Sequence, residues 1–335
     1  MFAQLLEKLT RREDLTADEA SLAMDAIMEE RATPGQVAGL LMGLAMKGER
    51  PPEIVGLARA MREHAVPFAA GEGNVMDVCG TGGDRAGTFN ISSMTALLVA
   101  AAGVRVAKHG NRSVSSRCGS ADVFEALGVK TTAPVAMVER SLEVAGIAFL
   151  FAPSFHPSMR YAAGVRRELG LRTAFNLLGP LTNPARPRRQ LVGVPRPELT
   201  ELIARALAML GSERAWVVHG ADGLDEITTT GPTLAYEIRD GAFERRTLEP
   251  GDFGVPVAAA GNLRGGDAAR NLAIAKAVLA GERGPQRDIV LANAAAALVA
   301  AGKAEVFLEG AALAAVSIDT GAARRKVEAL AAFTS

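Results

Sequence analysis

The spacing of apolar residues divides the chain into a helical start and a longer region of mixed pattern. Within residues 2–67, apolar side chains recur at intervals of three and four, which is typical of amphipathic helices. Two helix starts carry a threonine cap with a glutamate or glutamine three residues later, Thr16 with Glu19 and Thr33 with Gln36. The pattern predicts four short helices that form a small helical domain.

After residues 71–73, short runs rich in β-branched residues alternate with longer helical patterns. This alternation predicts a mostly parallel sheet covered by helices. Asp240 and Gly241 join two further short runs and predict a hairpin. The predicted strands are 75–79, 104–107, 147–151, 216–218, 236–239 and 243–248; the predicted helices are 93–102, 121–127, 134–145 and 199–210, with a mainly helical C-terminus.

Residues 157–187 fit neither pattern. They are rich in arginine and end in the turn sequence of residues 179–184. We interpret this segment as lining a cleft between two domains. We therefore expect a helical domain of residues 1–70, completed by helices within 157–187, and an α/β domain of residues 71–335.

Composition agrees with this division and excludes several classes of protein. A length of 335 residues suits two domains, and the apolar fraction of 49% is enough for a buried interior. The zero net charge disfavours binding to nucleic acid or to an anionic membrane surface. Two cysteines make no disulfide framework. We find neither a signal peptide nor a membrane span, so the cytoplasm is the expected location.

The first candidate for chemistry is the glycine-rich segment Asp77-Val-Cys-Gly-Thr-Gly-Gly-Asp84. It lies between a predicted strand and a predicted helix, at a strand end where ligands of α/β sheets collect. Glycines allow backbone N–H groups to approach phosphate oxygens, and short hydroxyl side chains follow within residues 88–93. The segment matches neither the Rossmann nor the P-loop pattern. A plain flexible turn is the alternative interpretation.

Two more polar segments follow predicted strands. Lys108 opens the first, residues 108–116, where it could act as a point charge on phosphate. The second contains the adjacent carboxylates Asp225 and Glu226, oxygen ligands that suit Mg²⁺ together with substrate phosphates. The alternatives are a solvated loop and exposed surface acids. Taken together, the segments indicate transfer chemistry on a phosphorylated or diphosphorylated substrate.

Six motifs in order along the chain resemble the anthranilate phosphoribosyltransferase family. They are residues 77–84, Asn90-Ile-Ser-Ser93, Lys108-His-Gly-Asn-Arg112, Gly119-Ser-Ala-Asp122, residues 172–184 and Gly223-Leu-Asp-Glu226. The resemblance implies a nucleoside phosphorylase/phosphoribosyltransferase-like fold, with a small N-terminal helical domain, a larger α/β domain and a site at their hinge. It also implies a homodimer that transfers the phosphoribosyl group of phosphoribosyl pyrophosphate (PRPP) to the amino group of anthranilate in tryptophan biosynthesis.

The resemblance assigns residues to each ligand. Asn111, Arg166 and the turn Gly179-Pro180 would position anthranilate, with Gly80 and His109 beside it. Ser92, Asp225 and Glu226 would hold Mg²⁺, the expected cofactor. His109 is the one candidate for a general base, and no catalytic residue is assigned. The residues implied for PRPP are Gly80, Gly83, Asp84, Thr88, Asn90, Ile91, Ser92, Ser93, Lys108, His109, Gly110, Asn111, Arg112, Ser113, Val114, Ser115, Ser116 and Ser120.

Three rival classes make different demands on the sequence. A pyrimidine nucleoside phosphorylase of the same fold would carry a Lys-[His/Ser]-Ser-Gly-Gly loop, whereas this chain has Lys108-His-Gly-Asn111 and the pair Asp225-Glu226. A type I phosphoribosyltransferase would place its acidic pair directly after a buried strand. A non-catalytic nucleic-acid-binding relative would be basic and would lack the substrate residues.

Overall fold

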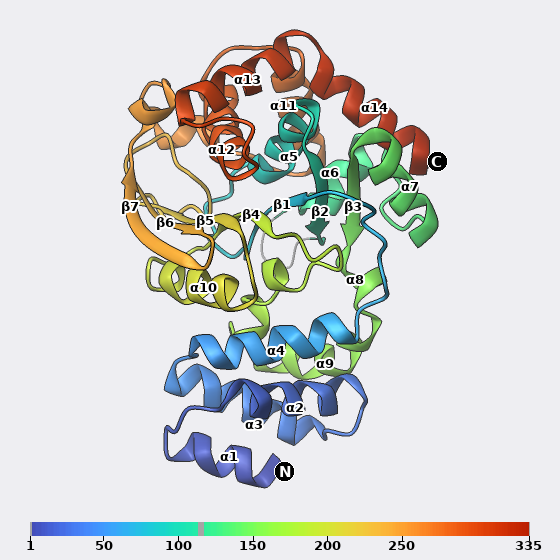
Figure 1. Ribbon diagram of the computed structural model, residues 1–335, viewed down its shortest axis with the longest axis vertical. Coiled ribbons are helices and arrows are strands. Elements are labelled where there is room, and N and C mark those ends of the chain that lie inside the picture. Colours follow the sequence, from blue (N-terminus) through green and yellow to red (C-terminus); the bar gives the residue numbers. More distant parts are fainter. Residues whose placement is uncertain (1, 113–116, 335) are drawn as a thin grey trace.

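The protein is elongated, with a helical bundle at one end and an α/β body at the other (Figure 1). The computed structural model describes residues 2–112 and 117–334. The N-terminus lies at the tip of the bundle, and the C-terminus lies on the far side of the α/β body.

Four helices form the bundle, as the apolar pattern predicts. Both threonine caps are present: the Thr16 hydroxyl accepts from the amide of Glu19, and the Thr33 hydroxyl accepts from that of Gln36. The helix α9 (Arg160–Leu169), from much later in the chain, packs against α2 and α3. The four helices are α1 (Phe2–Thr10), α2 (Ala17–Met28), α3 (Pro34–Lys47) and α4 (Pro51–Glu63).

One sheet of seven strands forms the centre of the α/β body, in the order β3-β2-β1-β4-β5-β6-β7. The first five strands in the chain are parallel, and β6 and β7 form an antiparallel hairpin. The chain order reverses between β1 and β4, which is the switch point where open α/β sheets bind ligands. The strands are β1 (Val75–Gly80), β2 (Arg105–Gly110), β3 (Ile147–Phe151), β4 (Arg189–Gly193), β5 (Arg214–Gly220), β6 (Thr233–Arg239) and β7 (Ala242–Leu248).

Helices cover both faces of the sheet. α5, α11, α12, α13 and α14 lie over the face away from the bundle, and α10 lies between the other face and α4 (Figure 1). The apolar core on the α10 side continues without a break into the bundle. The helices of the body are α5 (Ile91–Ala101), α6 (Ser120–Ala126), α7 (Val135–Ala145), α8 (Ala152–Phe155), α10 (Glu198–Met209), α11 (Ala268–Leu279), α12 (Pro285–Ala300), α13 (Phe307–Asp319) and α14 (Ala322–Thr334). Short 3₁₀ turns lie at Pro157–Met159, Ala174–Asn176, Gly179–Leu181, Pro250–Phe253 and Ala260–Leu263.

The fold class predicted from the sequence is confirmed, and four strands differ from the prediction by more than one residue: β2, β4, β5 and β6. The strand β4 was not predicted, because it is short and begins with the polar pair Arg189-Gln190. The strands β2 and β5 run further than predicted, so Lys108 and His109 lie inside β2 rather than in a loop after it. Polar side chains are tolerated there because each finds a hydrogen-bond partner.

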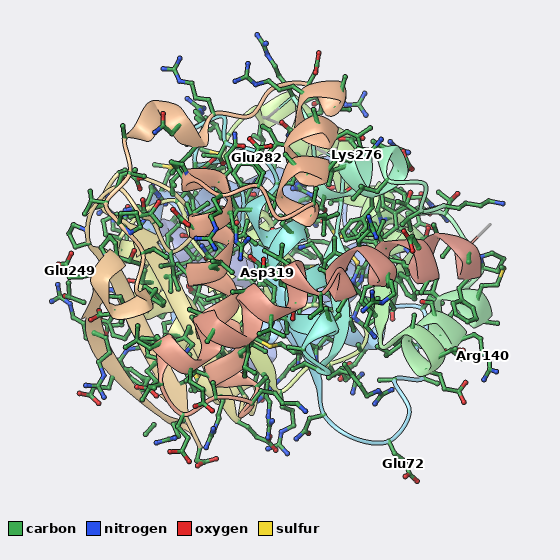
Figure 2. All side chains as sticks on the ribbon, turned by 90° about the horizontal axis from the view of Figure 1, so that it is seen from above. Glu72, Arg140, Glu249, Lys276, Glu282 and Asp319 are labelled. Carbon is green, nitrogen blue, oxygen red and sulfur yellow. The ribbon has the colours of Figure 1, made fainter. Side chains whose placement is uncertain are left out.

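The surface of the body carries acids and bases side by side. Seen from above, Glu72, Arg140 and Glu249 point outward from its rim (Figure 2). Within residues 2–112 and 117–334, no helix is long and apolar enough to cross a membrane.

Candidate active site

Two glycines at the switch point make room for a carboxylate. Gly80 ends β1 and Gly193 ends β4, and the two are direct partners in the parallel register. A Cβ on Gly80 would lie 2.4 Å from Oδ2 of Asp225, and one on Gly193 would lie 1.6 Å from the backbone oxygen of Asp225. Because both positions lack a side chain, Asp225 can lie directly over the ends of the two central strands.

Backbone amides hold one oxygen of each adjacent carboxylate. The amide of Gly82 donates to Oδ2 of Asp225 at 2.8 Å, and the amide of Ser92 donates to Oε1 of Glu226 at 3.0 Å. Burial, followed by the charge of Asp84, raises the pKa of Asp225 to about 7. Burial and the charge of Asp225 raise the pKa of Glu226 well above its usual range. Burial and mutual repulsion thus disfavour the charged form of both carboxyl groups.

The carboxylate pair is fixed from behind by α12. Asn293 is fully buried, and its side chain accepts from the amide of Ile227 at 2.9 Å and donates to the carbonyl of Ile227 at 2.8 Å. In the described ranges, no group of three His, Cys, Asp or Glu side chains could hold a metal ion. A cation at Asp225 and Glu226 would therefore need further ligands from substrate and water.

Lys108 brings a positive charge beneath this end of the sheet. Its side chain is 1% exposed, and Nζ donates to the Val78 carbonyl at 2.7 Å and to Oγ of Ser92 at 3.4 Å. Its charge partly offsets the rise in the pKa of Glu226. The sequence analysis expected Lys108 in a polar segment after a strand and did not predict its burial.

An arginine that was not among the predicted site residues, Arg172, also holds the glycine-rich loop. Nη1 of Arg172 donates to the carbonyl of Gly82 at 2.8 Å. Gly83 has a φ of 85°, and a Cβ on it would lie 1.6 Å from Nη1 of Arg172. Arg172 lies shortly after α9, the helix that packs on the bundle. The chain leaving the bundle therefore contacts the glycine-rich loop directly.

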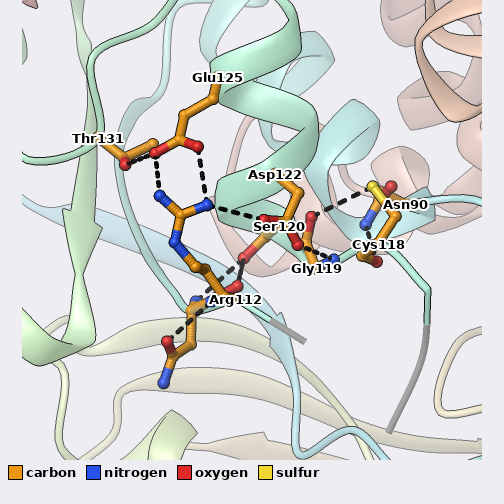
Figure 3. A network of polar contacts seen from close by, with 9 residues as sticks. Asn90, Arg112, Cys118, Gly119, Ser120, Asp122, Glu125 and Thr131 are labelled. Carbon is orange, nitrogen blue, oxygen red and sulfur yellow. Dashed lines mark hydrogen bonds and ion pairs between the residues drawn. The ribbon is translucent and has the colours of Figure 1, made fainter. Parts of the chain in front are cut away.

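A second polar network surrounds the start of α6 (Figure 3). Oγ of Ser120 accepts from the amide of Asn111 and donates to its carbonyl, both at 3.2 Å. The Arg112 guanidinium pairs with Asp122 at 2.9 Å and with Glu125 at 2.6 Å. Its charge is thus balanced by two carboxylates of this network. Residues 113–116, which include the predicted Ser113, Val114, Ser115 and Ser116, lie outside the described residues.

Asn90 links this network to α11. It donates to the Cys118 carbonyl at 3.1 Å and accepts from Nδ2 of Asn271 at 2.9 Å. Thr88 lies nearby in an isolated β-bridge with Arg264. The side chains of Ile91 and Ser93, also predicted to contact PRPP, are buried at the start of α5. Of the predicted PRPP residues, Gly80, Gly83 and Asp84 thus belong to the glycine-rich loop. On α5, Ile91 and Ser93 are buried and Ser92 is partly exposed.

Two of the residues predicted for anthranilate, His109 of β2 and Gly179, are joined by a hydrogen bond. Nδ1 of His109 donates to the Gly179 carbonyl at 3.0 Å, so Nε2 keeps its lone pair. This nitrogen is buried and has no partner within the described chain. Burial, followed by the neighbouring His156, lowers the pKa of His109 to about 3. The imidazole is therefore neutral at pH 7.

Two buried residues brace this region. Asp77 accepts from the amide of His109 at 3.1 Å through one oxygen and from Nδ2 of Asn183 at 2.9 Å through the other. The same Asn183 group donates to the Ala107 carbonyl at 2.8 Å. The motif at residues 172–184 is thus tied to the centre of the sheet through its asparagine.

Arg166 lies on α9 and is half-buried. Its guanidinium stacks over the ring of Phe175 at 5.3 Å, and burial lowers its pKa. In the part of the chain that the structure describes, no carboxylate pairs with it. The structure joins His109 to Gly179 but shows no direct contact from Arg166 to either residue, so the predicted anthranilate set does not form one network.

The two-part fold and this site define a class of enzyme. The family model described as "Glycosyl transferase family, helical bundle domain" matches residues 3–65, and "Glycosyl transferase family, a/b domain" matches residues 72–324. The protein is thus a two-part glycosyl transferase. The chain is 58% identical over 332 residues to anthranilate phosphoribosyltransferase of Solibacter usitatus, with 98% of each chain covered. It is 55% identical over 333 residues to the Moorella thermoacetica enzyme of the same name, covering 99% of this chain and 98% of the other.

Solved structures agree. Anthranilate phosphoribosyltransferase from Thermus thermophilus matches with a TM-score of 0.93 and 45% identity, covering 98% of each chain. The Saccharomyces cerevisiae enzyme in complex with PRPP and Mg matches with a TM-score of 0.90 and 26% identity, covering 99% of this chain and 97% of the other. The chain belongs to the anthranilate phosphoribosyltransferase family.

Proposed function

We propose that this enzyme transfers the 5-phosphoribosyl group of PRPP to the amino group of anthranilate and releases pyrophosphate, a step of tryptophan biosynthesis. The observation that carries the proposal is the position of Asp225 over the register pair Gly80–Gly193, beside the glycine-rich loop. This places a carboxylate site at the sheet's switch point, where a diphosphate and its cation would bind. The S. cerevisiae relative, solved with PRPP and Mg, supports the same assignment.

The donor set at this point fits Mg²⁺. Asp225 and Glu226 offer hard oxygen ligands, and a divalent cation would offset the burial and mutual repulsion that raise their pKa values. Ser92 lies between Glu226 and Lys108 and completes the predicted metal set. When bound, Mg²⁺ would neutralise the pyrophosphate oxygens and make pyrophosphate a better leaving group.

The residues of this chain then have to bind and orient two substrates. In the reaction, the amine nitrogen of anthranilate bonds to the anomeric carbon while the bond from that carbon to pyrophosphate breaks, and the amine loses a proton. The glycine-rich loop and Lys108 would favour the negative charge of the leaving group. His109, Arg166 and the Gly179-Pro180 turn would hold anthranilate, so the weak aniline nucleophile is kept close to the ribose.

The neutral imidazole of His109 suits orientation better than proton removal. Its pKa of about 3 makes it a weak base at pH 7. Its free Nε2 can accept a hydrogen bond from the amine of anthranilate, because Nδ1 is already committed to Gly179. We infer that His109 directs the amine, and that no side chain of the described site is a dedicated general base.

One assay tests the reaction. Purified protein is mixed with anthranilate, PRPP and Mg²⁺, and the loss of anthranilate fluorescence is followed. We expect turnover that requires all three components. Absence of turnover here, combined with turnover of thymidine and phosphate, would instead establish a pyrimidine nucleoside phosphorylase. A salt-sensitive shift of DNA by a protein without either activity would support the nucleic-acid-binding alternative.

Arg166→Ala should selectively weaken anthranilate binding. The Arg166 guanidinium is half-buried and has no carboxylate partner within residues 2–112 and 117–334, which suits it to the carboxylate of anthranilate. We expect the KM for anthranilate to rise at least about tenfold while the KM for PRPP changes less than about twofold. Arg167→Ala, at the exposed neighbouring position, is the control. A larger change in the KM for PRPP would contradict the assignment.

We also propose that the enzyme is a homodimer joined through its helical domain. The helical domain exposes two large apolar side chains that such an interface could cover, Leu22 on α2 at 52% and Met46 on α3 at 72%. A solution mass by light scattering equal to that of one 34.8 kDa chain would contradict this proposal.

We place the boundary of the helical domain near residue 70, with α9 completing it, because α9 packs on α2 and α3.

A further inference from the structure

Three consecutive carbonyl groups in the Gly179–Leu181 turn are each held by a side chain from a different element. Nδ1 of His109, from β2, donates to Gly179 at 3.0 Å. Nε2 of Gln190, from β4, donates to Pro180 at 2.8 Å, and Nε of Arg62, from α4, donates to Leu181 at 2.6 Å. Two of the three bonds come from the sheet, and one comes from the helical bundle.

The contribution from the bundle is the unusual one. Arg62 is largely buried, and burial together with the nearby charge of Arg186 lowers its pKa to about 10. It forms no ion pair with any carboxylate of residues 2–112 and 117–334. Its bond to Leu181 is its only hydrogen bond within those ranges. A buried charge without a counter-ion is costly, and within the described residues the hydrogen bond to the Leu181 carbonyl is the polar contact that offsets this cost.

The turn that Arg62 holds is the one to which the proposed function assigns anthranilate. Leu181 is fully buried, whereas Gly179 is exposed, so the turn is anchored at one end and open at the other. Gly179 also orients His109, whose Nε2 is buried and has no hydrogen-bond partner in the described chain. Because Gly179, Pro180 and Leu181 are consecutive, a shift of the Leu181 carbonyl would displace the turn that orients His109.

We propose that Arg62 is a positioning residue for the acceptor substrate: it ties α4 to the Gly179–Leu181 turn and so sets the anthranilate site relative to the helical domain. The inference rests on the proposed function, because it takes anthranilate to be the ligand of this turn. It assigns to the bundle a direct part in acceptor binding through one hydrogen bond. Loss of that bond misplaces the turn without touching the PRPP side.

Two nearly isosteric variants separate the hydrogen bond from the charge. In Arg62→Gln, the amide nitrogen takes the place of Nε and can still donate to Leu181, without the charge. In Arg62→Met, a methyl group takes that place and cannot donate. Arg59→Met is the matched control, because Arg59 is exposed on the same helix and makes no hydrogen bond or ion pair to the described chain. Steady-state KM for each substrate and kcat are measured for all three, with thermal unfolding as a check of folding.

The expected pattern is selective. Arg62→Met raises the KM for anthranilate about fivefold or more and leaves the KM for PRPP within about twofold, while Arg62→Gln and Arg59→Met stay near wild type. Equal changes in both KM values, no change, or the same defect in Arg62→Gln would overturn the proposal. If Arg62→Met does not fold, Arg62→Ser, which admits water to the Leu181 carbonyl, replaces it with the same expected split. A wild-type protein without turnover would instead contradict the proposed function, whereas an active wild type with unaffected variants contradicts only the role of Arg62.

Discussion

The double variant Asp225→Asn, Glu226→Gln is expected to lose at least about 100-fold in kcat/KM at saturating Mg²⁺, since it removes both proposed metal carboxylates. The changes preserve shape, and both amide oxygens can still accept from Gly82 and Ser92. The loop should therefore remain in place while its affinity for the cation falls. Activity is measured over a range of Mg²⁺ concentrations, and the Mg²⁺ concentration for half-maximal rate is expected to rise.

The same double variant should be more stable than wild type at high pH, although it is less active. The raised pKa of Asp225 means that the folded state holds the proton more tightly than the unfolded chain, so stability falls as the pH rises from near 4 to about 7. At pH 8 without Mg²⁺, the variant should therefore unfold at a higher temperature than wild type. Added Mg²⁺ should stabilise wild type but not the variant.

A matched pair of exposed glutamates controls for net charge. Glu72 and Glu282 are exposed at the surface (Figure 2), whereas Asp225 and Glu226 are buried, so Glu72→Gln with Glu282→Gln removes the same charge from outside the site. This control should keep both its activity and its response to Mg²⁺. If the Asp225–Glu226 variant retained wild-type activity at limiting Mg²⁺, these residues would not be the metal ligands.

The fold was predictable where local sequence signals agree with the final packing. Two of the bundle helices, α2 and α3, begin at threonine caps that need only residues three positions apart. The hairpin turns at Asp240-Gly241, both at positive φ. The strand β4 was missed because its pattern depends on a distant partner. Gln190 is fully buried only because its amide donates to Pro180, a contact that no local periodicity encodes.

The site divides in the same way. Motifs with glycines or adjacent carboxylates could be identified as candidates, and the structure brings the glycine-rich loop, Lys108 and Asp225-Glu226 together. The residues that support them are single side chains far away in the sequence. Arg172 reaches Gly82 across 90 positions, and Asn293 reaches Ile227 across 66. An isolated asparagine within an alanine-rich helix is a weak hint of such a role, because a buried amide needs partners.

The glycine at the end of β4 is the other position where a small change should have a large effect. Gly193→Ala places a Cβ 1.6 Å from the carbonyl oxygen of Asp225 and 2.4 Å from its carbonyl carbon. Both are backbone atoms, so no side-chain rotation can relieve the overlap. Either the loop carrying Asp225 or the end of β4 must move, at an expected cost of about 1–3 kcal/mol in the free energy of unfolding. Urea unfolding measures this cost.

Gly193→Ala should also impair activity, because the residue that it displaces, Asp225, carries a proposed metal carboxylate. We expect kcat/KM to fall at least about tenfold and the Mg²⁺ concentration for half-maximal rate to rise. Gly231→Ala is the control, since a Cβ there meets nothing within 4 Å. If Gly193→Ala matched this control in stability and in Mg²⁺ requirement, the loop would not lie against β4 as described. A destabilised variant with an unchanged Mg²⁺ requirement would separate the packing role of Gly193 from the placement of Asp225, because only a moved carboxylate changes the affinity for the cation.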